Sequence, residues 1–292
     1  GGDISITGTG HVSGQYGYGF WIGDNYTRVR AGGNGNITIN GTSTDIGSSD
    51  ALGMQIRTAG SITTNNGNIT LIGTSRGTTG NYNVGIGFSS LGSVVAGGVG
   101  SVTLTGTAGT SGIGSVGVSN AVVTTSGGAI NITGATSSTG TSSAGIATNA
   151  ALNSAGGNIT LTADSYLGSG TESINAGTGT VTFKNRTAGT LINLGGSDVA
   201  GATGTRALGI TDAELDVITA NALVIGQTGA TASGDVTVST NINPALTKSL
   251  KILSGGNITL NANSVINTLA NGNVVLNSDS DGDGSGAIVF NT

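Results

Sequence analysis

The sequence predicts an all-β fold, a right-handed parallel β-helix with three sides, and three observations lead to it. A short phrase, GNITINGT at 35–42 and GNITLIGT at 67–74, recurs along the chain, which is the mark of a stacked repeat. Apolar and polar residues alternate within it, as in half-buried strands. Glycine makes up 56 of 292 residues and proline only one, which suits many tight turns and excludes a collagen-like chain.

The first strand of each repeat follows a marker glycine. These glycines stand at 2, 35, 67, 100, 128 and 157, so the repeats are 28–33 residues long. Alternate residues of a strand point to the same side, and here the apolar residues occupy one side. We therefore predict an inward-facing core of Ile37 and Ile39, Ile69 and Leu71, Val102 and Leu104, Ile130 and Ile132, and Ile159 and Leu161.

The second strand of each repeat is aligned on another glycine, at 19, 53, 85, 117 and 145. The residue after it is predicted to face the core, as is Tyr18 before it, whereas Trp21 falls in an outward column. A looser third strand follows, for example TRVRA at 27–31. Three strands per repeat match one coil of a three-sided solenoid, and each coil needs its neighbours to bury its apolar face.

The chain divides into two regions by regularity. Residues 1–163 read as regular coils of 28–33 residues, and residues 164–292 as a less regular continuation with shorter coils. Thr211 and Glu214 form a capping-box pattern and Ile210 with Leu215 a hydrophobic staple, which predict one short helix at 212–219, the only one in the chain. Strand phrases resume at 234, 256 and 272, in steps of 22 and 16 residues, as expected for smaller coils or a tapering end.

The coil phrases resemble those of large secreted bacterial adhesins of the filamentous haemagglutinin type. The block from LGITDAELDVITANALVIG at 208–226 to NSDSDGDGSGAIVF at 277–290 resembles a recurring module of such exoproteins. The Asn-Pro-rich motifs of that family's secretion domain are absent apart from Asn243-Pro244, so we expect a shaft segment. The resemblance implies display at the bacterial cell surface, export through an outer-membrane secretion pore, and adhesion to glycans or proteins of host or neighbouring cells.

Composition excludes several other classes. The chain has no cysteine, so it has neither disulfides nor thiolate metal sites. Only 8% of its residues are charged and its net charge is −5, whereas nucleic-acid binding needs clustered Lys and Arg. No apolar run approaches about 18 residues, so we expect no membrane span. Because the chain begins with Gly1, we expect a mature segment cut from a longer protein.

One segment, QYGYGFWIGDNYTRVR at 15–30, holds five of the ten aromatic residues. The candidate ligand contacts are Trp21, Tyr26, Arg28 and Arg30, which together would bind a sugar or a protein partner. The alternative is that the aromatic residues cover an open end of the solenoid, because uncovered strand edges recruit other chains.

A second candidate site is the stretch DSDGDGSG at 279–286. Asp279, Asp281 and Asp283 are spaced like the start of a Ca²⁺ loop, but Phe290 stands where that loop places a glutamate. A solvated acidic turn is the alternative, and no other cofactor is expected.

The sequence favours a structural and adhesive extracellular β-solenoid, the shaft of a surface adhesin or of a filament that self-associates into fibres. An enzyme is not expected, because His11 is the only histidine and the carboxylates are scattered, with none between Asp50 and Asp164. Two alternatives stay open: a carbohydrate-active β-helix enzyme, and an ice-binding solenoid that uses outward pairs such as Thr103 with Thr105 and Thr160 with Thr162.

Overall fold

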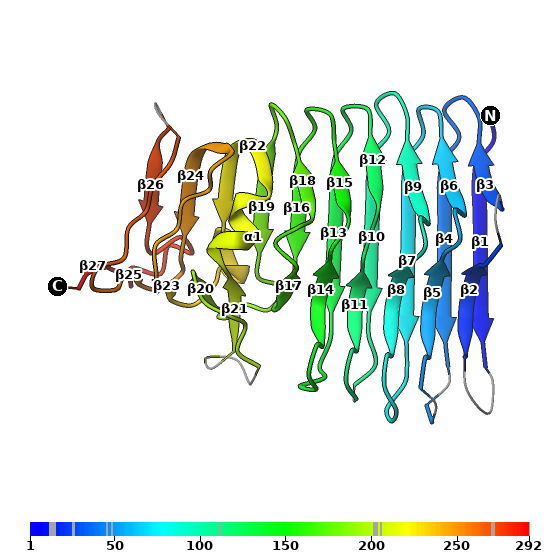
Figure 1. Cartoon of the computed structure of the whole chain (residues 1–292), viewed down its shortest axis with the longest axis horizontal. Coiled ribbons are helices and arrows are strands. Elements are labelled where there is room, and N and C mark those ends of the chain that lie inside the picture. Colours follow the sequence, from blue (N-terminus) through cyan, green and yellow to red (C-terminus); the bar gives the residue numbers. More distant parts are fainter. Residues whose placement is uncertain are drawn as a thin grey trace.

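The computed structural model describes residues 1–11, 16–24, 27–44, 46–47, 49–110, 112–200, 204, 206–269 and 272–291. They form a parallel β-helix, elongated along the stacking direction, with the chain termini at opposite ends (Figure 1). The three predicted strands of each coil lie in three separate columns of parallel strands over the regular region. The expected fold class is therefore confirmed.

The first column runs the length of the molecule. It contains β1 (Ile4–Gly10), β4 (Ile37–Ser43), β7 (Ile69–Ser75), β10 (Val102–Thr107), β13 (Ile130–Ala135), β16 (Ile159–Thr162), β19 (Thr180–Lys184), β22 (Ile218–Ile225), β24 (Thr247–Leu253) and β26 (Val274–Asn277). At roughly 4.8 Å between paired strands, nine steps between ten strands make a stack about 43 Å long.

The second and third columns complete the regular coils. The second contains β2 (Tyr18–Ile22), β5 (Leu52–Ile56), β8 (Val84–Phe88), β11 (Val116–Ser119), β14 (Ala144–Thr148) and β17 (Tyr166–Gly168). The third contains β3 (Arg28–Ala31), β6 (Ser61–Thr64), β9 (Ser93–Ala96), β12 (Val123–Thr125), β15 (Ala151–Asn153) and β18 (Ser173–Asn175).

The core is a set of matched columns of apolar side chains. One column of residues paired in register on successive strands is Ile37, Ile69, Val102, Ile130 and Ile159. A second column, two residues further along each strand, is Ile39, Leu71, Leu104, Ile132 and Leu161. All ten predicted core residues are at most 2% exposed. The two series continue through Val181 and Phe183 to Leu223 and Ile225. Because every coil presents the same pair of positions to its neighbours, the phrase has to recur.

A seam of glycines separates the core from the outer part of each regular coil. At Gly73 a Cβ atom would lie only 2.2 Å from the Gly85 carbonyl oxygen, because the backbones of β7 and β8 are in direct contact there. The same contact recurs between Gly8 and Gly19, Gly41 and Gly53, Gly106 and Gly117, and Gly134 and Gly145. The aligned glycines of the sequence are therefore required by the close approach of two strands.

Tyr18 does not face the core, and this expectation was wrong. Its ring stacks on that of Trp21 at 5.5 Å between centroids, and Trp21 is 54% exposed. The reason is Gly19, where a Cβ atom would point at the backbone of β4, 2.1 Å from the Thr42 nitrogen. Gly19 therefore occupies the inward-facing position, and Tyr18 before it points outward. Phe20 packs against the core as predicted.

Long links join the first and second columns of the regular region, and we call the row of their described residues the ledge. Ser43 ends β4 and Leu52 begins β5, so eight residues lie between them, and the links 76–83, 108–115 and 136–143 have the same length. The next link has only three residues, 163–165, between β16 and β17. The ledge is therefore interrupted at this coil.

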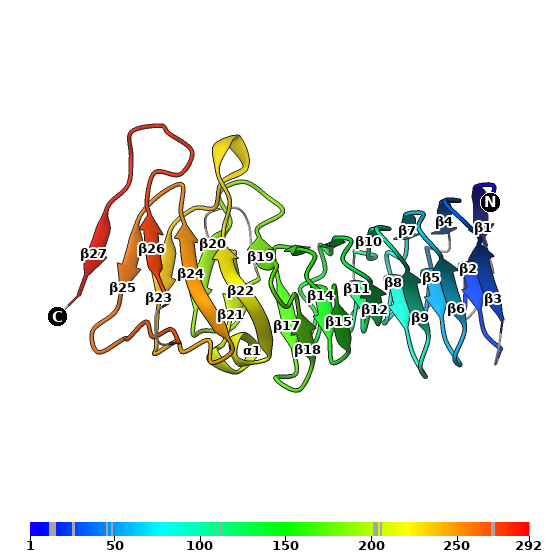
Figure 2. The ribbon, with the colours of Figure 1, turned by 90° about the horizontal axis from the view of Figure 1, so that it is seen from above.

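The C-terminal region has a different cross-section and is broader in the view from above (Figure 2). A further parallel sheet appears, in the order β21 (Ala207–Ile210), β20 (Leu191–Leu194), β23 (Val236–Val238), β25 (Ile258–Leu260) and β27 (Ile288–Phe290). β22 is long enough to pair with β18 through Ile218 and with β19 through Leu223. The corner between the third and first columns therefore disappears.

The predicted helix is present but shorter than expected. α1 spans Asp212–Asp216, and Thr211 and Glu214 form the capping box: the Thr211 amide donates to Glu214 Oε2 at 2.8 Å. The expected end at 219 was wrong, because Ile218 pairs with Ile174 and so already belongs to β22. A short 3-10 helix, η1 (Gly229–Thr231), also lies within the described chain, so α1 is not the only helix.

The three C-terminal phrases do not form one column. Those at 234 and 256 pair, Val236 with Ile258, at the predicted step of 22. The phrase at 272 instead supplies β26, in which Val274 pairs with Leu250 of β24, and β27 continues from β25. The step of 16 therefore joins two different sheets and is not a coil.

Both ends of the stack leave apolar residues partly uncovered. At the C-terminal end Val275 and Phe290 are 47% and 68% exposed, and at the other end Ile4 and Ile6 are half-buried. Among the described residues no helix has the length and apolar character needed to cross a membrane.

Candidate functional site

Three stacked rings form an aromatic patch on the outer face of β2. Tyr16, Tyr18 and Trp21 make up this patch, with Tyr16 and Tyr18 stacked at 6.3 Å and Tyr18 and Trp21 at 5.5 Å between centroids. Tyr16 and Trp21 are about half exposed. Exposed rings with a polar edge supply rigid contact area at low entropic cost. Tyr26, also a predicted contact, lies outside the described residues.

A shallow groove of about 280 Å³, lined by both polar and apolar residues, adjoins the patch. Its lining includes Asp50, Gln55, Arg57 and Ser89, and Gln55 Nε2 donates to Ser89 Oγ at 3.1 Å. Burial raises the pKa of Asp50. Burial also raises the pKa of the Tyr18 hydroxyl, against the opposing effect of the Arg57 charge. The groove therefore offers both hydrogen-bond donors and acceptors beside an apolar surface.

The two arginines predicted beside Trp21 lie on another face. Arg28 and Arg30 extend from the outer side of β3, in the third column, and both are exposed. They line an open groove of about 410 Å³ together with Ser61, Thr63, Asn65, Ser93 and Val95. The sequence placed the four contacts in one segment, but the described part of that segment divides them between two sheets.

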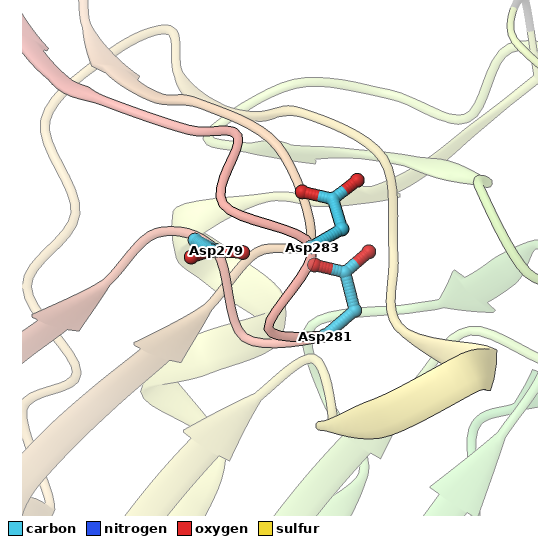
Figure 3. A group of neighbouring side chains, drawn as sticks. All are labelled: Asp279, Asp281 and Asp283. Atoms are coloured by element: carbon cyan, nitrogen blue, oxygen red, sulfur yellow. The ribbon is translucent and has the colours of Figure 1, made fainter.

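The three aspartates of the predicted Ca²⁺ loop do lie together. One carboxylate oxygen from each of Asp279, Asp281 and Asp283 is within 4.8 Å of the others. Figure 3 shows Asp281 and Asp283 extending to the same side of the turn. Asp279 and Asp283 each already accept a local hydrogen bond on one oxygen, from the amides of Gly284 and Ser285 respectively. Asp279 is half-buried and the other two are exposed, an arrangement that suits either a weak oxygen-ligand site or a solvated turn.

A polar notch, which sequence reasoning missed, lies where the ledge is interrupted. It is a hollow of about 310 Å³ that adjoins a second of about 170 Å³. We define it by Ser137, Asp164, Arg186, Asp198 and Arg206, which line one or both hollows. Its sequence signal is the short coil: Gly179, which precedes β19, follows the marker glycine Gly157 by only 22 residues, whereas earlier markers are 28 or more residues apart.

Asp164 is the most firmly held side chain of the notch. It accepts from the Arg206 guanidinium at 3.0 Å, from the amides of Arg186 and Thr187, and from the hydroxyls of Thr187 and Thr190. Burial would raise the pKa of Asp164, but the hydrogen bonds outweigh it and hold the pKa below its ordinary value. This carboxylate therefore stays ionised and fixes the position of Arg206.

Asp198, which also lines the notch, has a raised pKa, in contrast to Asp164. Burial, reinforced by the charge of Glu214, raises the pKa of Asp198 to about 7, although the Gly209 amide donates to it at 2.7 Å. Glu214 and Glu172 are buried nearby, both in contact with the β17 end at Gly168. The expectation that the acidic residues are scattered was therefore wrong for this part of the chain, because the short coil brings residues from several turns together.

Comparisons with known proteins add no family to this geometry. No family model, no curated protein and no solved structure matches the chain.

Proposed function

We propose that this chain is a structural and adhesive segment of an extracellular β-solenoid, part of the shaft of a bacterial surface adhesin or filament. One observation carries the proposal: the core columns that begin at Ile37 and Ile39 run through successive coils without a break in register. Continuous pairing of every inner strand makes a stiff rod, and a stiff rod is what a shaft must be.

The aromatic patch supplies the contact surface in this proposal. Trp21 and Tyr16 present exposed rings beside a groove with hydrogen-bonding groups. Aromatic side chains of this kind are enriched where proteins bind partners. The partners are glycans or proteins of a host or neighbouring cell, and export through an outer-membrane pore brings the segment to them.

Self-association into fibres is part of the same proposal. Exposed apolar residues at the stack ends, such as Val275 and Phe290, lie on strands with one unpaired edge. Such edges pair readily with other strands, whether these belong to a further coil of the same protein or to a second copy of the chain.

One feature favours a second candidate, an ice-binding or flat-surface-binding solenoid. The register stacks outward threonines at 38, 70, 103, 160 and 182, with Asn131 interrupting the row. A second row contains Thr105, Thr133 and Thr162 but also Asn40 and Ile72. Thermal hysteresis of the purified chain in a nanolitre osmometer is the test that would favour this candidate over adhesion.

The adhesive role is tested by binding of the whole chain to an array of host-type glycans and matrix proteins. We expect Trp21→Ala to lower binding at least about ten-fold. Tyr82→Ala is the matched control, because Tyr82 is equally exposed, at 52%, and lies outside the patch. Equal binding by the two variants, or a globule rather than a rod in negative-stain electron microscopy, would contradict the proposal.

A further inference from the structure

The polar notch has the shape of a binding site. The link 136–143 lines both hollows, Asp198, Val199 and Ala200 line the smaller one, and the short link 163–165 contributes Asp164 and Ser165 to both. The two hollows share Thr136, Ser137, Asp164, Ser165 and Arg206, so they form one continuous cleft. A volume of about 310 Å³ with an adjoining 170 Å³ falls within the range of small-molecule sites.

Hydrogen-bonding groups of both kinds line the cleft. Arg186 and Arg206 supply donors, and Asp198 supplies an acceptor. Hydroxyl groups that both donate and accept come from Thr107 at the end of β10, from Thr110 in the link 108–115, and from Thr136 and Ser137 in the link 136–143. Asp164 is saturated by its five donors, so its role is to hold Arg206 in place.

The charges of the cleft oppose ionic ligands of either sign. Arg206 and Asp164 neutralise each other as an ion pair. A cation would then meet the charge of Arg186, and an anion would meet the Asp198 carboxyl group, with Glu214 behind Asp198 close enough to act on it electrostatically. No aromatic side chain is among the lining residues, so an apolar ring finds no stacking partner. The ligand that remains is uncharged and carries many hydroxyl groups.

We propose that the polar notch binds a neutral saccharide, whose hydroxyl groups bond to Arg186, Arg206 and Asp198 and to the hydroxyl side chains of the ledge. Each sugar hydroxyl both donates and accepts a hydrogen bond, which matches a lining that mixes guanidinium, carboxyl and hydroxyl groups. The notch lies beside β13, β16 and β19, several coils away from the aromatic patch on β2. The polar notch is therefore a separate site from the aromatic patch, and Trp21→Ala should leave its saccharide binding unchanged.

The test is a titration of the ¹⁵N-labelled whole chain with maltotriose, cellotriose and the acidic trigalacturonate, each to about 20 mM. We expect at least one neutral trisaccharide to shift the amides of Ser137, Gly145 and Ser165 with a Kd of about 1 mM. Trigalacturonate should bind at least about ten-fold more weakly than that sugar.

Three variants locate the effect. Ser137 is exposed, so Ser137→Tyr fills the cleft without disturbing the core and should abolish the shifts. Arg186→Gln should weaken binding about ten-fold. Arg76→Gln, at an exposed arginine in the link 76–83 that lines neither hollow, is the matched control and should bind as the parent chain does. No shift with either neutral sugar, unchanged binding by Ser137→Tyr, or tighter binding of trigalacturonate would overturn the proposal.

Discussion

The glycine seam makes a sharp prediction for the variant Gly73→Ala. An added Cβ atom would lie 2.2 Å from the Gly85 carbonyl oxygen and 2.6 Å from Ile86 Cγ1. To restore an ordinary contact distance of roughly 3.5 Å, the backbones of β7 and β8 must separate by more than about 1 Å. Neither strand can move alone, because β7 pairs with β4 and β10, and β8 with β5 and β11.

We expect this single methyl group to lower the free energy of unfolding by about 3 kcal/mol, the upper part of the usual range for overpacking. Gly32→Ala is the matched control, since no atom lies within 4 Å of its added Cβ and its backbone is not left-handed. Removing the freedom of a glycine from the unfolded chain should leave that variant equal to the parent or up to about 1 kcal/mol more stable.

Urea denaturation followed by circular dichroism measures both variants, with the midpoint and the slope compared separately. A lower midpoint at unchanged slope for Gly73→Ala, and none for Gly32→Ala, is the expected result. If Gly73→Ala unfolds at the same urea concentration as the parent, the two strands do not touch at the seam and the account of the aligned glycines fails.

Three further predictions concern the core, the polar notch and the acidic turn. Leu104→Ala should cost about 2–5 kcal/mol of unfolding free energy, and the outward-facing Thr103→Ala on the same strand under about 1; equal losses in urea denaturation would refute the inward assignment. Because burial, with the charge of Glu214, raises the pKa of Asp198 from 3.8 to about 7, the folded state holds an extra proton between those values. Unfolding midpoints should therefore fall as pH rises toward 7, and Asp198→Asn should flatten this slope; a parallel slope in the variant would refute the cause. Calorimetric titration should give a Ca²⁺ Kd no tighter than about 10⁻⁴ M, because three side-chain carboxylates converge without a bidentate glutamate; micromolar binding that Asp281→Asn abolishes would contradict this.

The core was predictable because it depends on a local pattern. Ile37 and Ile39 alternate with polar residues within one strand, and the same alternation recurs at each marker glycine. A parallel stack in register follows directly from equal phrases at nearly equal spacing. The capping box of Thr211 and Glu214 was predictable for the same reason, since its partners are three residues apart.

The polar notch was not predictable in this way. Asp164 and Arg206 are 42 residues apart, and their contact depends on a link that shortens to three residues in one coil. The alternation pattern says nothing about which loops meet across coils. Tyr18 shows the same limit on a smaller scale, because the strand changes direction at the seam and a pattern of period two assumes that it does not.

The sequence by itself determined the parallel stack, its two inner apolar columns and the glycines that let neighbouring strands touch. Each of these is repeated in every regular coil, so short-range alternation and spacing carry enough information to specify it. Only the tertiary structure decided what happens once: the interrupted ledge, the pairing of Asp164 with Arg206, the separation of Trp21 from Arg28 and Arg30, and the path of the C-terminal strands. A feature that occurs once has no repeat to reveal it, and it is set by contacts between residues far apart in the chain.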